Sequence, residues 1–529
     1  MQVHEHLHYR GSPLVAPPDQ TAAIRAAEVH RVELWWIAAA AVLAGAAALR
    51  LMALTAKALW FDETFSVFVA GHPVARLIAI VAANDAHPPL YYLLLRAWIL
   101  VFGDGEAAVR APSVVIGTAI VAVTWLFGRR LVGQRPALLA AALVAVAPSQ
   151  VSSSQEARMG ALLVLTALGS WWALWETAHG SRRAWWVYVT VSAVMLYSHY
   201  YAFFMLASQA VYVAWTRRAG ADLRRAILAG LAILLLFAPW VPALAGHLAG
   251  GQAWPAHRFP ITPAMFADTF ALMTAGLPVV GAADPRGWSL PRFGSAQIAL
   301  LGFVAAFILV AAGMRGVNSV WRSAASPPLL LCAAVCPVVF AYAASLVRNV
   351  YSPRYLIFIT VPIALLTAAG LAALWRGRAR WSRAVGLVLA ALIFVPNVMV
   401  LGAFYRQPAL DVFDWRSISR TMATAARPDD AIVFLPGFSR IPVNYYFRGP
   451  QPRLALTPQR LEGAGGQQEM RAVVAALARH PRVWVLTVVP VPPSVVALVD
   501  AMRRESYTLT AQQAINMARL VLLERAASP

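Results

Sequence analysis

The chain has 529 residues, of which 60% are hydrophobic and 13% are charged, and its formal net charge is +21. A soluble domain of this length cannot hide so much apolar surface beneath a polar coat, so the composition excludes an ordinary soluble protein. The positive charge does not indicate a nucleic-acid partner, because the arginines stand in short clusters between apolar segments rather than on one soluble face. The composition predicts a polytopic membrane protein.

Residues 1–33 form a polar N-terminal tail that lacks the layout of a signal peptide. The tail contains His4, His6 and His8 in alternation, a run that could bind a metal ion. We interpret this run as part of a disordered cytoplasmic tail.

Apolar segments long enough to cross a bilayer recur between residues 34 and 404. Short arginine clusters separate them, such as Arg129–Arg135 and Arg376–Arg383, and the positive-inside rule places these clusters in the cytoplasm. About eleven spans satisfy this rule, at residues 34–54, 112–128, 137–150, 159–176, 185–198, 200–215, 226–244, 296–314, 327–346, 355–375 and 384–404. An odd number of spans puts everything after residue 404 outside the cytoplasm.

Residues 88–102 are also apolar, but counting them as a span would invert every later loop and put the arginine clusters outside. The segment is short and carries Arg96 in its middle. It is therefore predicted to be an interfacial or re-entrant helix on the outer surface. The first external loop then covers residues 55–111, and a loop of that length between spans usually has a function.

From residue 409 the pattern changes. Short apolar runs at residues 432–435, 483–489 and 520–523 alternate with a helix-like segment at residues 468–480. Residues 409–529 are therefore predicted to form a small α/β domain packed on the external face. The predicted fold is a polytopic α-helical membrane domain, residues 34–404, followed by this α/β domain.

The first external loop carries the acidic residues that stand out in the chain. Asp62 and Glu63 follow the first span directly, and acids at a membrane boundary are costly to keep without a function. Further along the loop, two prolines fix the entry to the interfacial helix, and this entry carries Asp85, His87 and Tyr91. The alternative interpretations are a pair of solvated loop acids and a simple helix start signal.

Three arginines, Arg158, Arg348 and Arg354, lie at the outer membrane boundary and so oppose the inside bias for positive charge, and Arg158 and Arg354 are favoured over Arg348 for a specific role. An arginine in that position needs an anion, and a lipid phosphate is the obvious one, so both are predicted to bind it together with Tyr355. The alternative is that they snorkel to outer headgroups. Glu156 and His199 lie on the same side and are further candidates for lining the site.

In their order and shared sidedness these motifs resemble the GT-C superfamily of membrane glycosyltransferases, and within it the protein O-mannosyltransferases and aminoarabinose transferases. The resemblance covers residues 34–220 best. It rests on Asp62-Glu63, on His87-Pro-Pro-Leu at the helix entry and on Gln155-Glu-Ala-Arg-Met, and Ser352-Pro-Arg-Tyr-Leu also fits. Each motif is short, so the specificity comes from their order.

The resemblance implies an inverting glycosyltransferase that takes a hexosyl or pentosyl group from a polyprenyl-phosphate-linked donor in the outer leaflet. Its partners would be membrane lipids and an envelope acceptor, which is a glycolipid, a polysaccharide or a protein, at the periplasmic face of a bacterial inner membrane. Asp62 and Glu63 would be catalytic, with Asp62 taking the acceptor's proton. Arg158 and Arg354 would stabilise the departing lipid phosphate.

The remaining loop residues would support these groups. Glu63, Asp85 and His87 would position the acceptor or hold a divalent cation, since some relatives use one. Tyr91, Glu156 and His199 would help to position the acceptor or the donor. The second external loop has Glu156 as its only acid and lacks an Asp-x-Asp pair, so the sequence assigns no metal.

Two other classes of protein compete with an enzyme. A transporter or lipid-linked-sugar flippase would carry ionisable residues near the bilayer midplane, often beside inverted repeats. Here the acids gather at one surface and no internal repeat stands out. An assembly protein that presents its C-terminal domain would leave Asp62, Asp85 and Arg158 unexplained.

Overall fold

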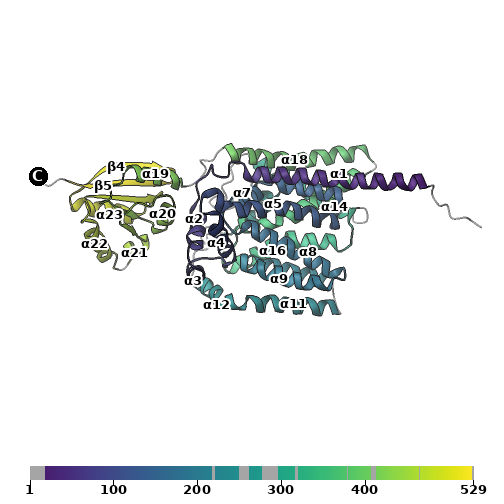
Figure 1. The fold of residues 1–529 in the computed structure, drawn as a ribbon, viewed down its shortest axis with the longest axis horizontal. Coiled ribbons are helices and arrows are strands. Elements are labelled where there is room, and N and C mark those ends of the chain that lie inside the picture. Colours follow the sequence, from purple (N-terminus) through teal and green to yellow (C-terminus); the bar gives the residue numbers. More distant parts are fainter. Residues whose placement is uncertain are drawn as a thin grey trace, which may run out of the picture.

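The computed structural model describes residues 18–216, 221–249, 261–276, 296–315, 320–377, 379–406, 413–463 and 465–526. A bundle of long helices forms the larger part, and a domain built around a β-sheet lies against one end of it (Figure 1). The histidine run of the N-terminal tail lies outside the described residues, as do residues 407–412 between the two parts.

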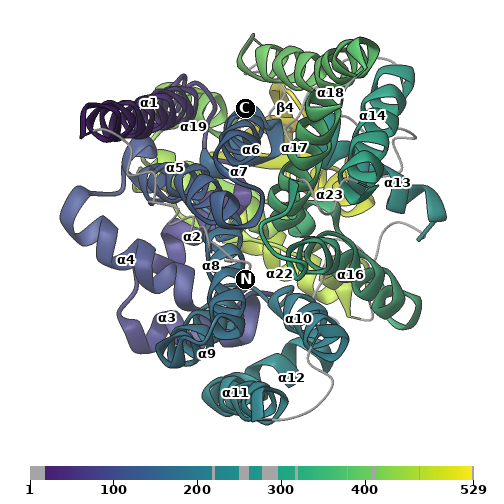
Figure 2. The same ribbon diagram turned by 90° about the vertical axis from the view of Figure 1, so that its right-hand side faces the viewer.

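The long helices run between the two ends of the bundle (Figures 1 and 2). They are α1 (Pro18–Leu51), α5 (Glu106–Leu131), α6 (Gln134–Val146), α8 (Gly160–Ala178), α9 (Arg182–Ser198), α10 (Ala202–Thr216), α11 (Ala221–Phe237), α14 (Ala296–Arg315), α16 (Ser326–Val347), α17 (Thr360–Arg376) and α18 (Arg380–Arg406). Each predicted span overlaps one of these helices, although the spans 137–150 and 226–244 run past the ends of α6 and α11, and the span 355–375 begins before α17. Prolines lie inside α5, α16 and α18, which is tolerated in membrane helices because neighbouring groups satisfy the freed carbonyl.

Seven helices among the described residues are long and apolar enough to cross a membrane, or up to eight if a bent pair is counted as one span. Helices α9 and α10 have 17 and 15 residues and are shorter than that group. Length and composition therefore support a polytopic membrane protein, while the count of about eleven spans stays a prediction.

The bent pair is α6 and α7 (Pro148–Ser154), whose axes differ by 60°. The break falls at Ala147, which has extended backbone and precedes Pro148. Proline cannot donate the backbone hydrogen bond that would continue α6, but it suits the first turn of the new helix. The bend brings Ser149, Ser152 and Ser153 to one wall of the cavity described below.

Three short helices, α2 (Phe61–Ala70), α3 (Val74–Asn84) and α4 (Leu90–Phe102), lie across the end of the bundle nearest the sheet domain (Figure 1). Helix α4 occupies the segment predicted to be interfacial, and Leu100 and Val101 at its end are 71% and 73% exposed. Helix α4 ends just before Gly103, whose positive φ of 80° suits glycine. Helix α5 begins soon afterwards, at Glu106, which is earlier than the start of the predicted span.

Short helices and turns complete the bundle: η1 (Ala238–Trp240), α12 (Val241–Ala249), α13 (Pro263–Ala275) and η3 (Pro353–Ile359). Helix η3 leads directly into α17, and the loop before it contacts the turn between α9 and α10, where the Tyr201 hydroxyl accepts from the Ser352 backbone N–H at 2.8 Å. This contact joins two segments that are distant in sequence at the end of the bundle that holds the cavity.

The C-terminal domain is built on a five-stranded sheet in the order β2-β1-β3-β5-β4. Strands β2, β1 and β3 are parallel, and β5 is antiparallel to both β3 and β4. The elements are β1 (Ala431–Phe434), β2 (Arg453–Ala455), β3 (Arg482–Val488), β4 (Tyr507–Ile515) and β5 (Ala518–Arg525), with α19 (Trp415–Ala425), η5 (Gly437–Ser439), α20 (Arg440–Tyr446), α21 (Pro458–Glu462), α22 (Gly466–Leu477) and α23 (Pro493–Arg504).

Both faces of this sheet are covered. Val433 packs in a core with Leu477 and Leu498 of α22 and α23, whereas Phe434 packs on the other face with Trp415. Burial on both faces explains why β1 and β3 read as unbroken apolar runs. Strand β4 lies at the sheet edge and is exposed along most of its length, so it lacks that signal.

The arginine clusters lie at the end of the bundle remote from the sheet domain. Helix α5 starts beside that domain, where Arg416 bonds Glu106, and reaches Arg130 about 36 Å further on at 1.5 Å per residue. The Arg322 backbone N–H donates to the Leu131 carbonyl at 2.9 Å, which puts Arg322 at the same remote end. Charge and geometry thus divide the bundle into a basic end and an end that carries the sheet domain.

We therefore expect the C-terminal domain to lie outside the cytoplasm, because the positive-inside rule assigns the basic end to the cytoplasm. A reporter that is active only in the periplasm, fused to the C-terminus, should be active. A fusion at residue 180, in the loop between α8 and α9 at the basic end, is the matched control and should be silent. The reverse pattern would overturn this sidedness.

Candidate active site

A cavity of about 520 Å³, including its open mouth, lies where α2, α7, the α9–α10 turn and η3 meet. It is lined by Asp62, Ser149, Ser152, Ser153, Glu156, Arg158, Met159, Gly160, Leu163, His199, Arg354, Tyr355 and Ile357. The structure thus brings together six of the residues that the sequence singled out: Asp62, Glu156, Arg158, His199, Arg354 and Tyr355. The other four, Glu63, Asp85, His87 and Tyr91, do not line this cavity.

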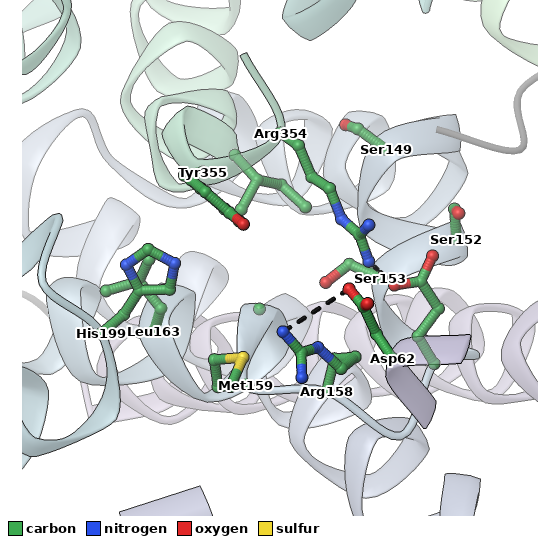
Figure 3. A pocket seen from close by; sticks show the side chains of 13 residues that line it. Asp62, Ser149, Ser152, Ser153, Arg158, Met159, Leu163, His199, Arg354 and Tyr355 are labelled. Atoms are coloured by element: carbon green, nitrogen blue, oxygen red, sulfur yellow. Dashed lines mark hydrogen bonds and ion pairs between the residues drawn. The ribbon is translucent and has the colours of Figure 1, made fainter. Parts of the chain in front are cut away.

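Asp62 and Arg158 form an ion pair on one wall of the cavity. Asp62 lies in the first turn of α2, where the helix dipole favours a negative charge, and its side chain is 30% exposed. The Arg158 guanidinium is 9% exposed, and one of its nitrogens lies 3.6 Å from the Asp62 carboxylate (Figure 3). Asp62 is therefore a charged group that is held in place yet remains open to a ligand.

A second ion pair forms another wall. The Arg354 guanidinium donates to the Glu156 carboxylate and stacks on the Trp60 ring, with its central carbon 4.5 Å from the ring centroid. Figure 3 shows the Arg354 and Arg158 side chains reaching into the cavity from opposite sides. Burial raises the pKa of the Glu156 carboxyl, although Arg354 opposes this effect. Two guanidinium groups and two carboxylates thus border one space.

Glu63, predicted to be catalytic, belongs to a buried structural cluster instead. Its side chain is 0% exposed, and its carboxylate accepts from Arg110 at 2.8 and 2.7 Å. The same carboxylate accepts from the backbone N–H groups of Ala157 at 2.9 Å and Trp60 at 3.2 Å. Successive residues on a helix point about 100° apart, so Glu63 turns away from the cavity that Asp62 faces.

Asp85 and His87 stand behind Arg158 rather than on the cavity wall. The Asp85 carboxylate accepts from Tyr92 and from His87, whose Nδ1 lies 3.1 Å away. The Tyr92 hydroxyl in turn accepts from Arg158 at 3.1 Å. Burial alone would raise the pKa of Asp85, but His87, Arg158 and Tyr92 hold it below its usual value. These residues form a chain that fixes the Arg158 guanidinium.

Tyr91 is placed differently from its neighbour. It is 2% exposed, and its hydroxyl lies 3.4 Å from Ser113 on α5, away from the cavity. Tyr92, the next residue on α4, reaches Arg158 instead. The predicted positioning role therefore fits Tyr92 better than Tyr91.

His199 lines the cavity as a neutral imidazole. Burial, helped by His87 and Arg158, lowers the pKa of His199 well below its usual value. Its Nδ1 accepts from the Tyr201 backbone N–H at 3.0 Å, so the hydrogen is on Nε2. Nε2 is buried and has no hydrogen-bond partner among the described residues. His199 therefore offers an uncharged donor to a ligand.

Two important residues escaped the sequence analysis, although one carried a usable signal. Arg110 lies at the predicted external end of a span, where the positive-inside rule disfavours arginine, and Arg158 carries the same signal. Tyr92 gave no signal that distinguishes it from Tyr91. Among the described residues there is no group of three or more His, Cys, Asp or Glu side chains that could hold a metal ion.

Comparison with known proteins supports the predicted resemblance. Residues 86–242 match the model of the dolichyl-phosphate-mannose-protein mannosyltransferase family. No curated protein sequence matches the chain.

Solved structures extend the likeness to the whole chain. ArnT from Cupriavidus metallidurans, bound to undecaprenyl phosphate, is similar with a TM-score of 0.62 and 13% identity over 93% of this chain and 99% of that one. The oligosaccharyltransferase of Archaeoglobus fulgidus gives 0.51 and 12% identity over 85% and 69%, and the mycobacterial arabinofuranosyltransferase AftD gives 0.52 and 14% identity over 92% and 40%.

The fold of the chain is thus the GT-C architecture that these solved membrane glycosyltransferases share. Within that superfamily, its segment 86–242 resembles the protein mannosyltransferases, and its full-length fold resembles ArnT.

The two adjacent acids should respond differently to neutralisation. Glu63→Gln leaves the Arg110 charge buried and unpaired, so it should destabilise the protein by about 3–5 kcal/mol. Asp62→Asn alters a partly exposed side chain and should change stability by no more than about 0.5 kcal/mol. Unfolding temperatures of the two variants in the same detergent test this contrast. If Glu63→Gln unfolds as the wild type does and yet loses turnover, Glu63 acts in the chemistry after all.

Proposed function

We propose that this protein is an inverting glycosyltransferase. It transfers a hexosyl or pentosyl group from a polyprenyl-phosphate-linked donor to an envelope acceptor at the periplasmic face of a bacterial inner membrane. The observation that carries the proposal is the cavity in which a partly exposed carboxylate, Asp62, lies beside two guanidinium groups, Arg158 and Arg354.

Asp62 is the proton acceptor in this reaction. An acceptor hydroxyl becomes a competent nucleophile only as it loses its proton, and a positioned carboxylate supplies that step. Of the acids that line the cavity, Glu156 is held in an ion pair with Arg354 and its side chain is 16% exposed, so its carboxylate is the less accessible of the two. Asp62 is more exposed and makes a looser pair at 3.6 Å, which leaves it accessible to an acceptor.

Arg158 and Arg354 bind the donor phosphate and stabilise the charge that grows on it as the glycosidic bond breaks. A guanidinium can grip phosphate oxygens with two parallel hydrogen bonds, and the side chains behind Arg158 pre-organise it for that purpose. Tyr355 also lines the cavity, beside Arg354 (Figure 3). The relative from Cupriavidus metallidurans binds a lipid phosphate, undecaprenyl phosphate, which supports the same class of ligand here.

A second cavity gives the lipid chain of such a donor a place to lie. It has a volume of about 340 Å³ including its mouth and is lined by apolar side chains, among them Ala167 on α8 and Val361 on α17. Leu163 and Ile357, one helical turn earlier on the same two segments, line the first cavity. We propose that this apolar space between α8 and α17, one helical turn from the polar site along both segments, holds the isoprenoid tail of the donor.

The remaining predicted residues take supporting parts. His199 donates from its neutral Nε2 to a sugar hydroxyl, since an uncharged donor suits a neutral ligand better than a phosphate. Asp85 and His87 act through Arg158. Glu156 keeps Arg354 charged and oriented.

Replacing Asp62 with asparagine should abolish transfer while the donor still binds. Losing one positioned proton acceptor costs roughly 100- to 10,000-fold in rate. The assay is release of free polyprenyl phosphate by purified protein in nanodiscs that contain a lipid-linked sugar and an acceptor, which also separates an enzyme from a flippase. Asp104→Asn, an exposed acid of the same loop outside the cavity, is the matched control. Near wild-type turnover of Asp62→Asn would refute the assignment of the base.

Arg158 should be needed for donor binding as well as for rate. Lysine keeps the charge but loses the planar fork, so Arg158→Lys should retain weak activity and Arg158→Ala should lose both affinity and turnover. Donor affinity of the two variants in nanodiscs measures this. Arg348→Ala removes an arginine at the same end of the bundle that does not line the cavity, and it should bind the donor normally. Equal affinities in all of these proteins would remove Arg158 from the site.

A further inference from the structure

The segment that leads to Asp62 has little regular structure of its own. Residues 52–60 connect α1 to α2 through turns and extended backbone. Backbone groups in such a segment still need hydrogen-bond partners, and where no helix or sheet supplies them, side chains from elsewhere must. The position of the catalytic carboxylate therefore depends on the groups that bind this segment.

One of these groups comes from the helical bundle. Arg110 on α5 donates to the carbonyls of Leu54 at 2.7 Å, Lys57 at 3.0 Å and Ala58 at 3.1 Å, besides its ion pair with Glu63. Arg110 thus holds the segment from the side of the membrane domain.

The C-terminal domain holds the same segment from the other side. Arg416 on α19 donates to the carbonyls of Thr55 at 2.9 Å and Lys57 at 3.3 Å. The Tyr446 hydroxyl, at the end of α20, accepts from the Leu59 backbone N–H at 2.7 Å. Phe438 packs edge-on against Phe61, with ring centroids 5.1 Å apart, directly beside the catalytic residue.

Glu106, at the start of α5, ties these contacts together. Its carboxylate accepts from the Tyr446 hydroxyl at 2.6 Å and from Arg416 at 3.1 Å through Nε, and from a second Arg416 nitrogen. The Arg416 and Glu106 side chains are 25% and 15% exposed, so this pair is shielded more than an ordinary surface salt bridge. The network thus fixes the Tyr446 hydroxyl where it meets the Leu59 N–H.

We propose that the C-terminal domain is a positioning element of the active site. Tyr446 and Arg416, oriented by Glu106, hold residues 54–60 so that α2 presents Asp62 to the cavity beside Arg158. The inference rests on the proposed role of Asp62, and it adds that the membrane domain alone holds the base imperfectly. Displacing a reacting group by about 1 Å can cost roughly 100-fold in rate, so a distant contact of this kind has a measurable effect.

Tyr446→Phe tests the proposal with a minimal change, because it removes only the hydroxyl. We expect kcat to fall roughly 10- to 100-fold while the KM for the lipid donor and the unfolding temperature stay near their wild-type values. Hydrogen exchange of a peptide that covers residues 54–63 should accelerate, because the Leu59 N–H loses its acceptor. Arg416→Lys should fall between the wild type and Arg416→Ala, since lysine can keep Glu106 paired but cannot also reach both carbonyls.

Arg448→Ala is the matched control. Arg448 also joins the C-terminal domain to the first loop, through Asp104 at 3.3 Å, but both side chains are exposed and the contact does not involve residues 54–60. The turnover of Arg448→Ala and its hydrogen exchange in residues 54–63 should be unchanged from the wild type. Wild-type kcat for Tyr446→Phe and Arg416→Ala would overturn the proposal, as would lowered kcat with unchanged exchange in residues 54–63. Hydrogen exchange is measured without any turnover, so it reports the effect of Tyr446 on residues 54–63 even if Asp62 is not the base. Full activity of Asp62→Asn would refute the base assignment alone.

Discussion

The buried ion pair of Glu63 and Arg110 is the interaction on which the site depends. It joins the first turn of α2 to the first turns of α5, and through Ala157 it also reaches the loop that carries Arg158. Two charges taken out of water are stable only when every remaining donor and acceptor is matched, and here backbone carbonyls and N–H groups match them. The main effect of such a pair is to fix the position of α2 relative to α5, because either charge without its partner would be buried and unpaired.

That geometry explains why two adjacent acids have different tasks. Glu63 is buried and paired with Arg110, whereas Asp62, about 100° around the helix from it, lines the cavity. The same division recurs on α4, where Tyr91 packs against α5 and Tyr92 supports Arg158. In both pairs one residue holds its element in place while its neighbour serves the cavity.

The sequence predicted the parts of this arrangement that follow from composition and sidedness. Apolar length and arginine bias located the long helices, because those signals are local. The expected sidedness also singled out Arg158 and Arg354, both of which line the cavity. Roles within the site were harder to predict. Glu63 was predicted to be catalytic because a pattern of residue types does not reveal which of two neighbours is buried, and that depends on Arg110, 47 positions away.

The contacts between the C-terminal domain and the first loop were beyond the reach of the sequence for a related reason. Arg416 and Glu106 are 310 positions apart and carry ordinary surface residue types. Strand β4 was also missed, since an exposed edge strand has no core-facing period to recognise. Apolar runs indicated β1, β3 and β5, because the sheet buries these strands. The hydrophobic pattern does not indicate how the C-terminal domain contacts the first loop.

The two ion pairs of the cavity suggest how binding and chemistry are connected under the proposed function. Without a ligand, Asp62 lies against Arg158, and Glu156 lies against Arg354, so each guanidinium group of the cavity faces a carboxyl group. A phosphate that arrives at Arg158 competes with Asp62 for the same guanidinium. Asp62 holds that guanidinium at 3.6 Å, whereas Tyr92 and Asp85 fix it from behind, so Asp62 is the partner that a phosphate can displace. A carboxylate that gives up an arginine accepts a proton more readily. Under this proposal, binding of the donor phosphate to Arg158 frees the Asp62 carboxylate to accept the proton of the acceptor hydroxyl. The buried Glu63–Arg110 pair keeps α2, and with it Asp62, at the cavity.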